Sequence, residues 1–398
     1  MAARIALFAS IVLSALGLAT FYLGSRLTAG APEWLHLPIW IALTVGVFIQ
    51  PISMVLVRFD HVGSESAVRV FQWVAYLAMG LFSLLLSFTM AVDAALLGLG
   101  LLDRGVAYAA ESTPVLLDAT SRNALLGWLH LGVFGGSLGI TTIGFFKARG
   151  LARTVEVDIP IDDLPEALEG FRIAQISDIH VGPTIRRPYL AAIVDRVNEL
   201  EPDLIAITGD LVDGSVETLR DDVAPLADLR ARHGSFFVTG NHEYYSGVRS
   251  WLAEVTRLGV KPLVNAHIVL HHEGAPMVVA GVTDYSAGHM IPAHVMDAER
   301  AVEGAPEEGT RLLLAHQPRS AYQAVDHGFD LMLAGHTHGG QYFPWTLLVT
   351  AAQPFTVGLH KLKQMWIYTS PGTGYWGPPI RFGSPSEITL LRLVRARS

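Results

Sequence analysis

The chain has no cysteine among its 398 residues. This excludes disulfide bridges, thiolate metal sites and cysteine nucleophiles, although it does not select a cellular compartment. Charged residues are also scarce, at 16% of the chain against about 25% in an average soluble domain. Because 51% of the residues are hydrophobic, the composition excludes a disordered or fibrous protein.

The few charges and the histidines are unevenly distributed along the chain. Residues 1–150 hold 15 charged side chains and three of the 16 histidines. Residues 151–398 hold 20 Lys or Arg against 29 Asp or Glu, with the other 13 histidines. The mean hydropathy of +0.38 is therefore an average over two unlike parts. We expect a transmembrane region over 1–150 and a separate acidic domain over 151–398. This domain lacks a basic stripe, so no nucleic-acid partner is expected.

Four apolar stretches in the first part are long enough to cross a bilayer, which needs about 20 apolar residues per helix. They run from about Ile5 to Leu23, from about Leu35 to Val57, within Val70–Leu102, and from about Ala124 to Phe146. The first stretch has the features of a signal peptide that ends at the small residues 29–31, but its apolar run is long for one, which favours a membrane anchor. Asp93 has no second ionisable residue in these spans, which favours a position at the lipid headgroups.

The positive charges that flank the four stretches predict their orientation. On one side lie Arg4, Arg58, Arg69, Lys147, Arg149 and Arg153, and on the other lie Arg26, Arg104 and Arg122. Because cytoplasmic loops carry the excess of Lys and Arg, the acidic domain is predicted to lie in the cytoplasm. The protein is thus expected in the inner, cytoplasmic membrane with several spans.

In the second part, short apolar runs end repeatedly in polar, glycine-rich clusters. The runs are 171–176, 203–208, 235–239, 311–315 and 329–334. Helical segments are predicted at about 188–200 and 217–230, and further strands at 266–271, 277–280, 365–369 and 387–393. This alternation predicts an α/β domain whose later strands form an antiparallel or mixed sheet. Ligand sites of such sheets lie beyond the carboxyl ends of strands.

The polar clusters provide oxygen and nitrogen ligands suited to zinc, manganese or iron. Seven candidate ligands follow the apolar runs: Asp178, His180, Asp210, Asn241, His316, His336 and His338. Seven are too many for one ion, but one shared carboxylate would give each of two ions four protein ligands. Two metals about 3.5–4 Å apart suit the in-line attack of water on phosphorus.

Each cluster alone has a simpler interpretation as a turn or a helix start, and His336-Thr-His338 within glycines could be a solvated metal-scavenging loop. The conjunction of all the clusters in this order favours a binding site.

The ordered clusters resemble the signature of the calcineurin-like metallophosphoesterase superfamily. They are Asp178-Ile-His180, Gly209-Asp210-Leu-Val-Asp213, Gly240-Asn241-His242-Glu243, His316 and Gly335-His336-Thr-His338. The resemblance covers about residues 155–394. The segment from Ser370 to Ile388 is similar to the bacterial membrane-anchored branch, which includes relatives of the lipid A biosynthesis enzyme that splits UDP-2,3-diacylglucosamine.

The resemblance implies a four-layer α/β/β/α sandwich, here preceded by an α-helical transmembrane region. It implies that Asp178, His180 and His338 hold one metal, that Asn241, His316 and His336 hold the other, and that Asp210 bridges them. His242 would donate a proton to the leaving group. Ser370-Pro371-Gly372 departs from the Ser-Arg-Gly or Asn-Arg-Gly of the family, which removes an expected basic contact.

We therefore expect a membrane-anchored hydrolase of phosphodiester or pyrophosphate bonds that uses two divalent ions, with manganese preferred and iron or zinc as alternatives. Its substrate could be lipid-linked, such as UDP-2,3-diacylglucosamine. Two alternatives stay open: a general phosphodiesterase or phosphatase acting on soluble substrates, and a non-catalytic metal-binding membrane partner protein. The aromatic residues Tyr244, Tyr245, Tyr375 and Trp376 either line the substrate cleft or pack in the core. No oligomeric state is predicted.

Overall fold

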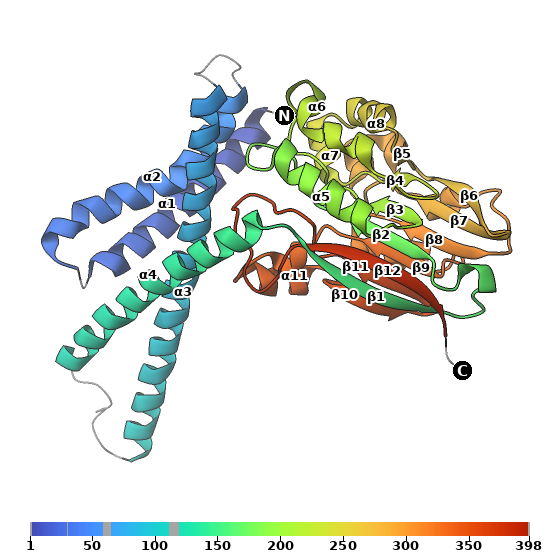
Figure 1. Cartoon of the computed structure of the whole chain (residues 1–398). Coiled ribbons are helices and arrows are strands. Elements are labelled where there is room, and N and C mark those ends of the chain that lie inside the picture. The colour runs from blue at the N-terminus through green and yellow to red at the C-terminus, as the bar shows by residue number, and fades with distance from the viewer. Residues whose placement is uncertain (1, 30, 59–64, 111–118, 397–398) are drawn as a thin grey trace. The chain divides into compact units, whose positions relative to one another are not determined.

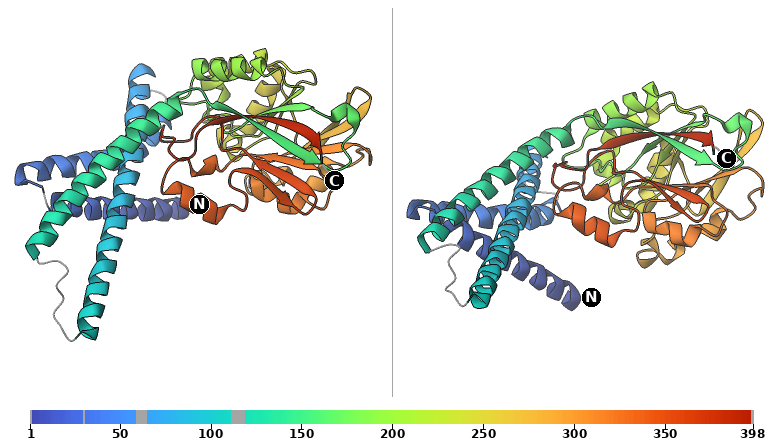
Figure 2. Two further views of the ribbon diagram at one scale, coloured as in Figure 1. Left: turned by 60° about the horizontal axis from the view of Figure 1, so that its bottom comes forward. Right: turned by 90° about the horizontal axis from the view of Figure 1, so that it is seen from below.

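The computed structural model describes residues 2–29, 31–58, 65–110 and 119–396 and divides into two compact units, Met1–Gly144 and Phe145–Ser398. Figures 1 and 2 show long helices in the first unit and two stacked sheets with covering helices in the second. Each unit is described by itself.

Four helices account for most of the described residues before β1: α1 (Ala2–Thr28), α2 (Glu33–Arg58), α3 (Glu65–Ala109) and α4 (Ala119–Arg149). They coincide with the four predicted apolar stretches. Among the described residues, three segments are long and apolar enough to cross a membrane: Ala9–Thr28, Ala67–Ala109 and Leu125–Arg149. The described apolar part of α2, Glu33–Ile49, is shorter. The number of spans stays a prediction, as does the orientation, since the side chains of Arg4, Arg58 and Arg122 and the residue Gly30 lie outside the description.

Asp93 corrects one inference drawn from the sequence. Its carboxylate accepts a hydrogen bond from the Tyr22 hydroxyl at 2.7 Å and lies 2.7 Å from Nε of Arg26. The expectation that Asp93 has no ionisable partner was wrong because α1 continues five residues beyond the predicted end at Leu23 and so brings Arg26 to the carboxylate.

The second unit contains two six-stranded sheets, as the α/β prediction required. The first has the order β1-β12-β2-β3-β4-β5 and the second the order β10-β11-β9-β8-β7-β6. The strands of the first sheet are β1 (Arg153–Ile161), β2 (Arg172–Ile176), β3 (Leu204–Ile207), β4 (Ser235–Phe237), β5 (Lys261–Pro262) and β12 (Glu387–Arg395). Those of the second are β6 (Ala266–His272), β7 (Ala275–Gly281), β8 (Thr310–Leu314), β9 (Leu331–Ala334), β10 (Gly358–Leu362) and β11 (Met365–Thr369).

Both sheets are mixed. Strands β2, β3, β4 and β5 run parallel, and β12 pairs antiparallel with β2. In the second sheet β7, β8, β9 and β11 run parallel, while the hairpin partners β6 and β10 are antiparallel at the two edges. The sequence missed β1, β5 and β10, because these strands lie at sheet edges or in a hairpin and carry weaker apolar patterns.

Three apolar layers explain the sandwich. Side chains from both sheets, such as Phe236 and Leu312, form the core between them. Helices α5 (Arg187–Glu199), α6 (Val216–Val223) and α8 (Val248–Arg257) cover the outer face of the first sheet. Helices α9 (Ala298–Ala301) and α10 (Ala321–Ala324) cover the outer face of the second. The domain therefore has the expected four-layer α/β/β/α architecture.

Short helices complete the unit: α7 (Asn241–Ser246), α11 (Trp345–Ala352) and the 3-10 turns η1 (Glu166–Leu168), η2 (Ala224–Asp228), η3 (Ala287–His289), η4 (Pro292–His294), η5 (Pro318–Ser320) and η6 (His338–Gly340). The predicted helix at 217–230 is divided into α6 and η2, since Pro225 cannot donate a backbone hydrogen bond within a continuous helix. The polar clusters all follow β2, β3, β4, β8 and β9.

Candidate metal centre

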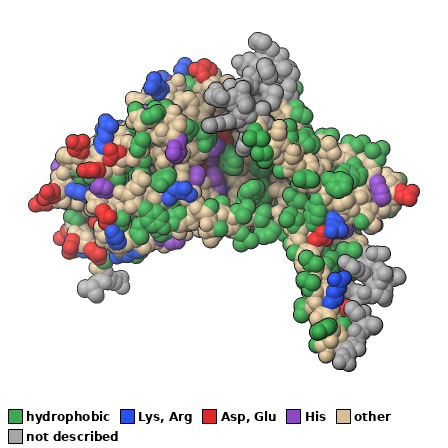
Figure 3. All heavy atoms as spheres, turned by 180° about the vertical axis from the view of Figure 1, so that it is seen from behind, with side chains coloured by type: hydrophobic (Ala, Val, Ile, Leu, Met, Phe, Trp, Pro, Cys, Tyr) green, Lys and Arg blue, Asp and Glu red, His purple; other side chains and the backbone are tan. Residues whose placement is uncertain are grey.

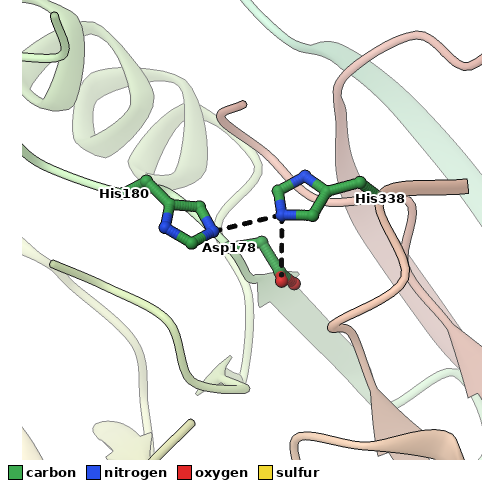
Figure 4. A group of neighbouring side chains, drawn as sticks. All are labelled: Asp178, His180 and His338. Atoms are coloured by element: carbon green, nitrogen blue, oxygen red, sulfur yellow. Dashed lines mark hydrogen bonds and ion pairs between the residues drawn. The ribbon is translucent and has the colours of Figure 1, made fainter. Parts of the chain in front are cut away.

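The first group of candidate ligands comes from both sheets. Asp178 and His180 follow β2, and His338 begins η6 after β9. Figure 4 shows their side chains pointing toward one another. The Nε2 atoms of His180 and His338 lie 3.1 Å apart, and Nε2 of His338 lies 3.5 Å from Oδ1 of Asp178. The three side chains are buried and offer ligand atoms within 4.8 Å of one another.

The second group consists of Asp210, His316 and His336. Nε2 of His316 lies 3.2 Å from Oδ2 of Asp210 and 3.1 Å from Nδ1 of His336. The other ring nitrogen of His316 donates to the Thr208 carbonyl at 2.8 Å, which leaves Nε2 to face the centre of the group. Figure 3 shows histidine side chains gathered on one face of the molecule.

Asp210 lies between the two groups. Its Oδ2 is 3.9 Å from Nε2 of His180 and 3.9 Å from Nε2 of His242. His180, Asp210 and His242 thus form a third set of converging ligand atoms. A carboxylate in this position can serve both groups of ligands.

The amide of Asn241 provides a test of whether these residues suit a metal. Its Oδ1 is buried and has no hydrogen-bond partner, although buried polar atoms are almost always paired. An amide oxygen is a metal ligand, and two pairs of imidazole nitrogens at 3.1 Å also converge as ligands of a cation do. The donor set therefore fits divalent metal ions.

Asp213 contacts two of the site histidines through one oxygen. Nδ1–H of His180 donates to Oδ1 of Asp213 at 3.0 Å, and Nδ1–H of His242 donates to the same atom at 2.5 Å. This contact fixes the tautomer of both rings and leaves each Nε2 facing Asp210, as supporting carboxylates do in metal sites. Asp213 belongs to the Gly209-Asp210-Leu-Val-Asp213 motif, but no role was predicted for it from the sequence. Its spacing of three residues from Asp210 was the available signal.

The electrostatics of the site separate its histidines into two kinds. Burial would lower the pKa of His242, but the hydrogen bond to Asp213 and the charge of Asp210 raise it to about 9. Burial, together with the charge of the neighbouring His316, lowers the pKa of His336 to about 4. A protonated His242 suits proton donation, whereas a neutral His336 suits metal binding.

Burial would raise the pKa of Asp210, but His316, His242 and His180 together hold it well below its usual range. Burial would lower the pKa of His316, and contact with Asp210 raises it instead. Burial, followed by the charge of Arg381, lowers the pKa of His338. The carboxylate of Asp210 is therefore ionised and can bind cations.

The ligand loops are held in an uncommon backbone conformation. Asp178, His180, Asp210, His336 and His338 all have positive φ, between 50° and 70°. Left-handed residues other than glycine are strained and cluster at functional sites. A Cβ on Gly335 would collide with the Ser177 hydroxyl and the Asp178 carboxylate, so this turn requires glycine.

Glu243 holds two of these loops together. Its fully buried carboxylate accepts hydrogen bonds from the backbone N–H groups of Gly240, Asp210 and Leu211 at 2.7, 3.0 and 2.8 Å. The loops that carry Asp210 and Asn241 are thereby fixed side by side. Sequence reasoning missed this role, because nothing in the pattern shows which loop Glu243 faces.

Arg381 lies behind the Ser370-Pro371-Gly372 loop. It is fully buried and donates to the carbonyls of Pro371 and Gly374 at 2.8 and 2.5 Å, with a further contact of 3.1 Å to Nδ1 of His338. Arg381 therefore places a cation at this loop, but the guanidinium group bonds to the protein's own carbonyls and to His338.

The four aromatic residues divide into two pairs. Tyr245 and Trp376 are 67% and 54% exposed. Each ring is packed edge-to-face with the imidazole of His242, with ring centres 5.3 and 5.7 Å apart. Tyr375 is buried and donates to the Thr184 carbonyl, whereas the Tyr244 hydroxyl contacts His294. Tyr245 and Trp376 thus flank the site, and Tyr375 packs in the core.

Comparison with known proteins agrees with this geometry. The family model described as calcineurin-like phosphoesterase matches residues 171–340. A Danio rerio protein named "Transmembrane protein with metallophosphoesterase domain" is 42% identical over 265 residues, which are 65% of this chain and 61% of that protein. A Bos taurus protein of the same name is 38% identical over 338 residues, 82% of this chain and 74% of the relative. An "Uncharacterized metallophosphoesterase" of Helicobacter pylori is 37% identical over 292 residues, 73% of this chain and 76% of the relative.

The chain thus spans about three fifths of the zebrafish protein and about three quarters of the other two. The matched segment holds all the strand-end clusters from Asp178 to His338, and it was these clusters that carried the resemblance seen in the sequence. With two relatives above 30% identity that it covers over more than two thirds of their length, the chain belongs to the calcineurin-like metallophosphoesterase family.

Proposed function

We propose that this protein is a membrane-anchored, two-metal phosphoesterase, with its membrane region in residues 1–150 and its catalytic domain in residues 151–398. One observation carries the proposal: the Asp210 carboxylate lies within 3.2–3.9 Å of imidazole nitrogens that belong to two different groups of ligands. A carboxylate in this position could serve as a ligand of two adjacent metal ions, the arrangement used for attack on phosphorus.

The residues would have distinct roles. Asp178, His180 and His338 would hold one ion, Asn241, His316 and His336 the other, and Asp210 both. Bound divalent ions, manganese by preference and iron or zinc as alternatives, would supply Lewis-acid activation of water and neutralise charge on the phosphoryl oxygens. His242, held by Asp213, would donate its proton to the departing oxygen.

The proposal is tested with the purified full chain, added manganese and bis-p-nitrophenyl phosphate. Asp210→Asn and His242→Ala are each expected to lose most of the hydrolysis. Asp195→Asn and His271→Ala are the matched controls, because both residues are exposed and lie outside the ligand groups. Full activity in both site variants would contradict the proposal, and two bound ions with no turnover of any phosphoester would favour a non-catalytic metal-binding partner protein.

For the substrate, we propose a lipid-linked phosphodiester or pyrophosphate, such as UDP-2,3-diacylglucosamine of lipid A biosynthesis, acted on at the cytoplasmic side of the inner membrane. The candidate spans and the exposed Tyr245 and Trp376 beside His242 support an amphiphilic substrate. Release of lipid phosphate from UDP-2,3-diacylglucosamine, followed by mass spectrometry, tests this choice. Turnover of soluble phosphodiesters alone would favour the general phosphodiesterase.

A further inference from the structure

Helix α11 is an apolar helix on the surface of the second unit. It comprises Trp345–Ala352, with the sequence WTLLVTAA, and none of its residues is buried. Trp345, Leu347 and Leu348 are 46%, 63% and 54% exposed. Isolated exposed apolar residues are common, but three within one uncharged helix form a patch of the kind that contacts a partner or a membrane.

This helix is directly connected to the candidate metal centre. It begins five residues after η6, which His338 opens. A Cβ on Gly340 of η6 would collide with the backbone of Trp345 and Thr346, so the two elements are in close contact. The position of α11 is therefore fixed relative to the ligand His338.

The same unit contains the last turn of α4, where a candidate membrane span ends at Arg149. The Arg149 guanidinium donates to the Thr184 carbonyl at 3.0 Å. The Tyr189 hydroxyl donates to the Ala148 carbonyl at 3.4 Å, and Nζ of Lys147 lies 5.7 Å from the centre of the Phe382 ring. These contacts fix where the span joins the second unit.

A short series of contacts links this junction to α11. The backbone N–H of Phe382 donates to the Gln341 carbonyl at 2.9 Å, and the backbone N–H of Thr346 donates to the Tyr342 carbonyl at 3.3 Å. Figures 1 and 2 show α11 and the last turn of α4 at the same end of the second unit. The apolar helix therefore lies at the end of the second unit at which a candidate membrane span ends.

We propose that α11 is an interfacial helix whose Trp345, Leu347 and Leu348 side chains insert into the surface of the bilayer that α4 enters. Tryptophan is enriched at the membrane–water interface, and exposed leucine side chains gain from burial at the boundary between headgroups and acyl chains. Arg319, which donates to the Ala352 carbonyl at 3.2 Å, places a cation at the end of the helix, where anionic headgroups attract it. Insertion of α11 into the bilayer would hold the loop of His338 at the lipid surface, whatever reaction the site performs.

The absence of cysteine allows a direct test with single-cysteine variants of the full chain. Leu348→Cys and, separately, Leu347→Cys are labelled with a nitroxide, and the protein is reconstituted in phosphatidylcholine vesicles that contain phosphatidylglycerol. Power-saturation spectroscopy then compares collisions with oxygen, which concentrates in the bilayer, and with a water-soluble nickel chelate. We expect oxygen to relax both labels more strongly than the nickel chelate does.

Val269→Cys is the matched control, because Val269 is an exposed apolar residue, 37% accessible, on the edge strand β6. Its label is expected to show the opposite preference. Stronger relaxation of the α11 labels by nickel would overturn the proposal, since α11 would then face water. Weak relaxation by both reagents would also overturn it, because the helix would then be covered by protein, either the first unit or a second copy. Unchanged melting temperatures establish that the variants fold, and none of these outcomes depends on phosphoesterase activity.

Discussion

Replacing Asp213 by asparagine tests how the site keeps a proton on His242. The two side chains are largely buried, 21% and 16% exposed, and 2.5 Å separates Oδ1 of Asp213 from Nδ1 of His242. Asparagine has nearly the same shape but no negative charge. Asp213→Asn therefore removes the electrostatic support of the imidazolium while it changes the packing little.

The size of the effect follows from the pKa of His242, which is about 9. A hydrogen-bonded carboxylate raises the pKa of a histidine by about 1–3. We therefore expect the pKa of His242 to be lower by about two in the variant. The proton-donating form is present below the pKa of the group and is lost as the pH rises through it. At pH 8.5 the protonated fraction would fall from roughly 75% to roughly 3%, a decrease of about 25-fold. Bound cations would lower the pKa of His242 in wild type and variant alike, so the variant keeps the lower pKa of the two.

The assay measures kcat against pH for two phosphodiesters that differ only in their leaving group, p-nitrophenol or the less acidic phenol. A leaving group that is less acidic depends more on protonation. We therefore expect Asp213→Asn to shift the alkaline decline of kcat to lower pH and to slow the phenyl ester more than the p-nitrophenyl ester. Because Asp213 also contacts His180, metal content is measured in the same samples.

Equal losses for both leaving groups, with an unchanged pH profile and full metal content, would refute the role given to the Asp213–His242 contact. A variant that has lost its metal would show instead that the contact with His180 dominates. The two results are distinguishable, since only loss of the proton donor depends on the leaving group.

Three further changes test the structure around the site. Gly335→Ala is expected to lose at least one bound ion, because the added methyl group collides with the Asp178 carboxylate. Elemental analysis after dialysis measures the metal content, and an unchanged content would contradict the close packing of this turn. Arg381→Met leaves the buried carbonyl of Pro371 without a donor, at a cost of about 1–3 kcal/mol, and removes the 2.5 Å hydrogen bond to the Gly374 carbonyl. The melting temperature should therefore fall by about 2–12 °C, and a change within error would refute this. Asp158→Asn breaks an exposed ion pair with Arg392, whose two hydrogen bonds of 2.8 Å are weakened by solvent. The melting temperature should therefore remain as in wild type. A decrease comparable to that of Arg381→Met would show that this pair contributes to stability.

Local patterns in the sequence predicted much of the second unit. The apolar runs at 171–176 and 329–334 became β2 and β9, because buried parallel strands are short, continuous and bounded by polar turns. The edge strand β1 was missed, since it is partly exposed and has the burial pattern of neither a core strand nor a helix. Residues of this kind are placed by their partner strand β12 and not by their own pattern.

The candidate ligands were also visible in the sequence, because Asp178, His180 and the others directly follow apolar runs and are poor packing material in those positions. What could not be predicted was which residues face them. Glu243 bonds to a loop that begins 33 residues earlier, and Arg381 contacts His338 across 43 residues. No local pattern encodes such contacts, since they depend on how two sheets stack.

The sequence by itself therefore determined the division into an apolar and an acidic part, the strand-end clusters with their candidate ligands and, through the absence of cysteine, the exclusion of thiolate chemistry. The tertiary structure decided that Asp213 serves both His180 and His242, that Asn241 presents an unpaired oxygen, and that Trp345, Leu347 and Leu348 stay at the surface. The physical reason is that residue type and periodicity are local properties, whereas hydrogen-bond partners, burial and charge contacts arise only when distant segments are brought together.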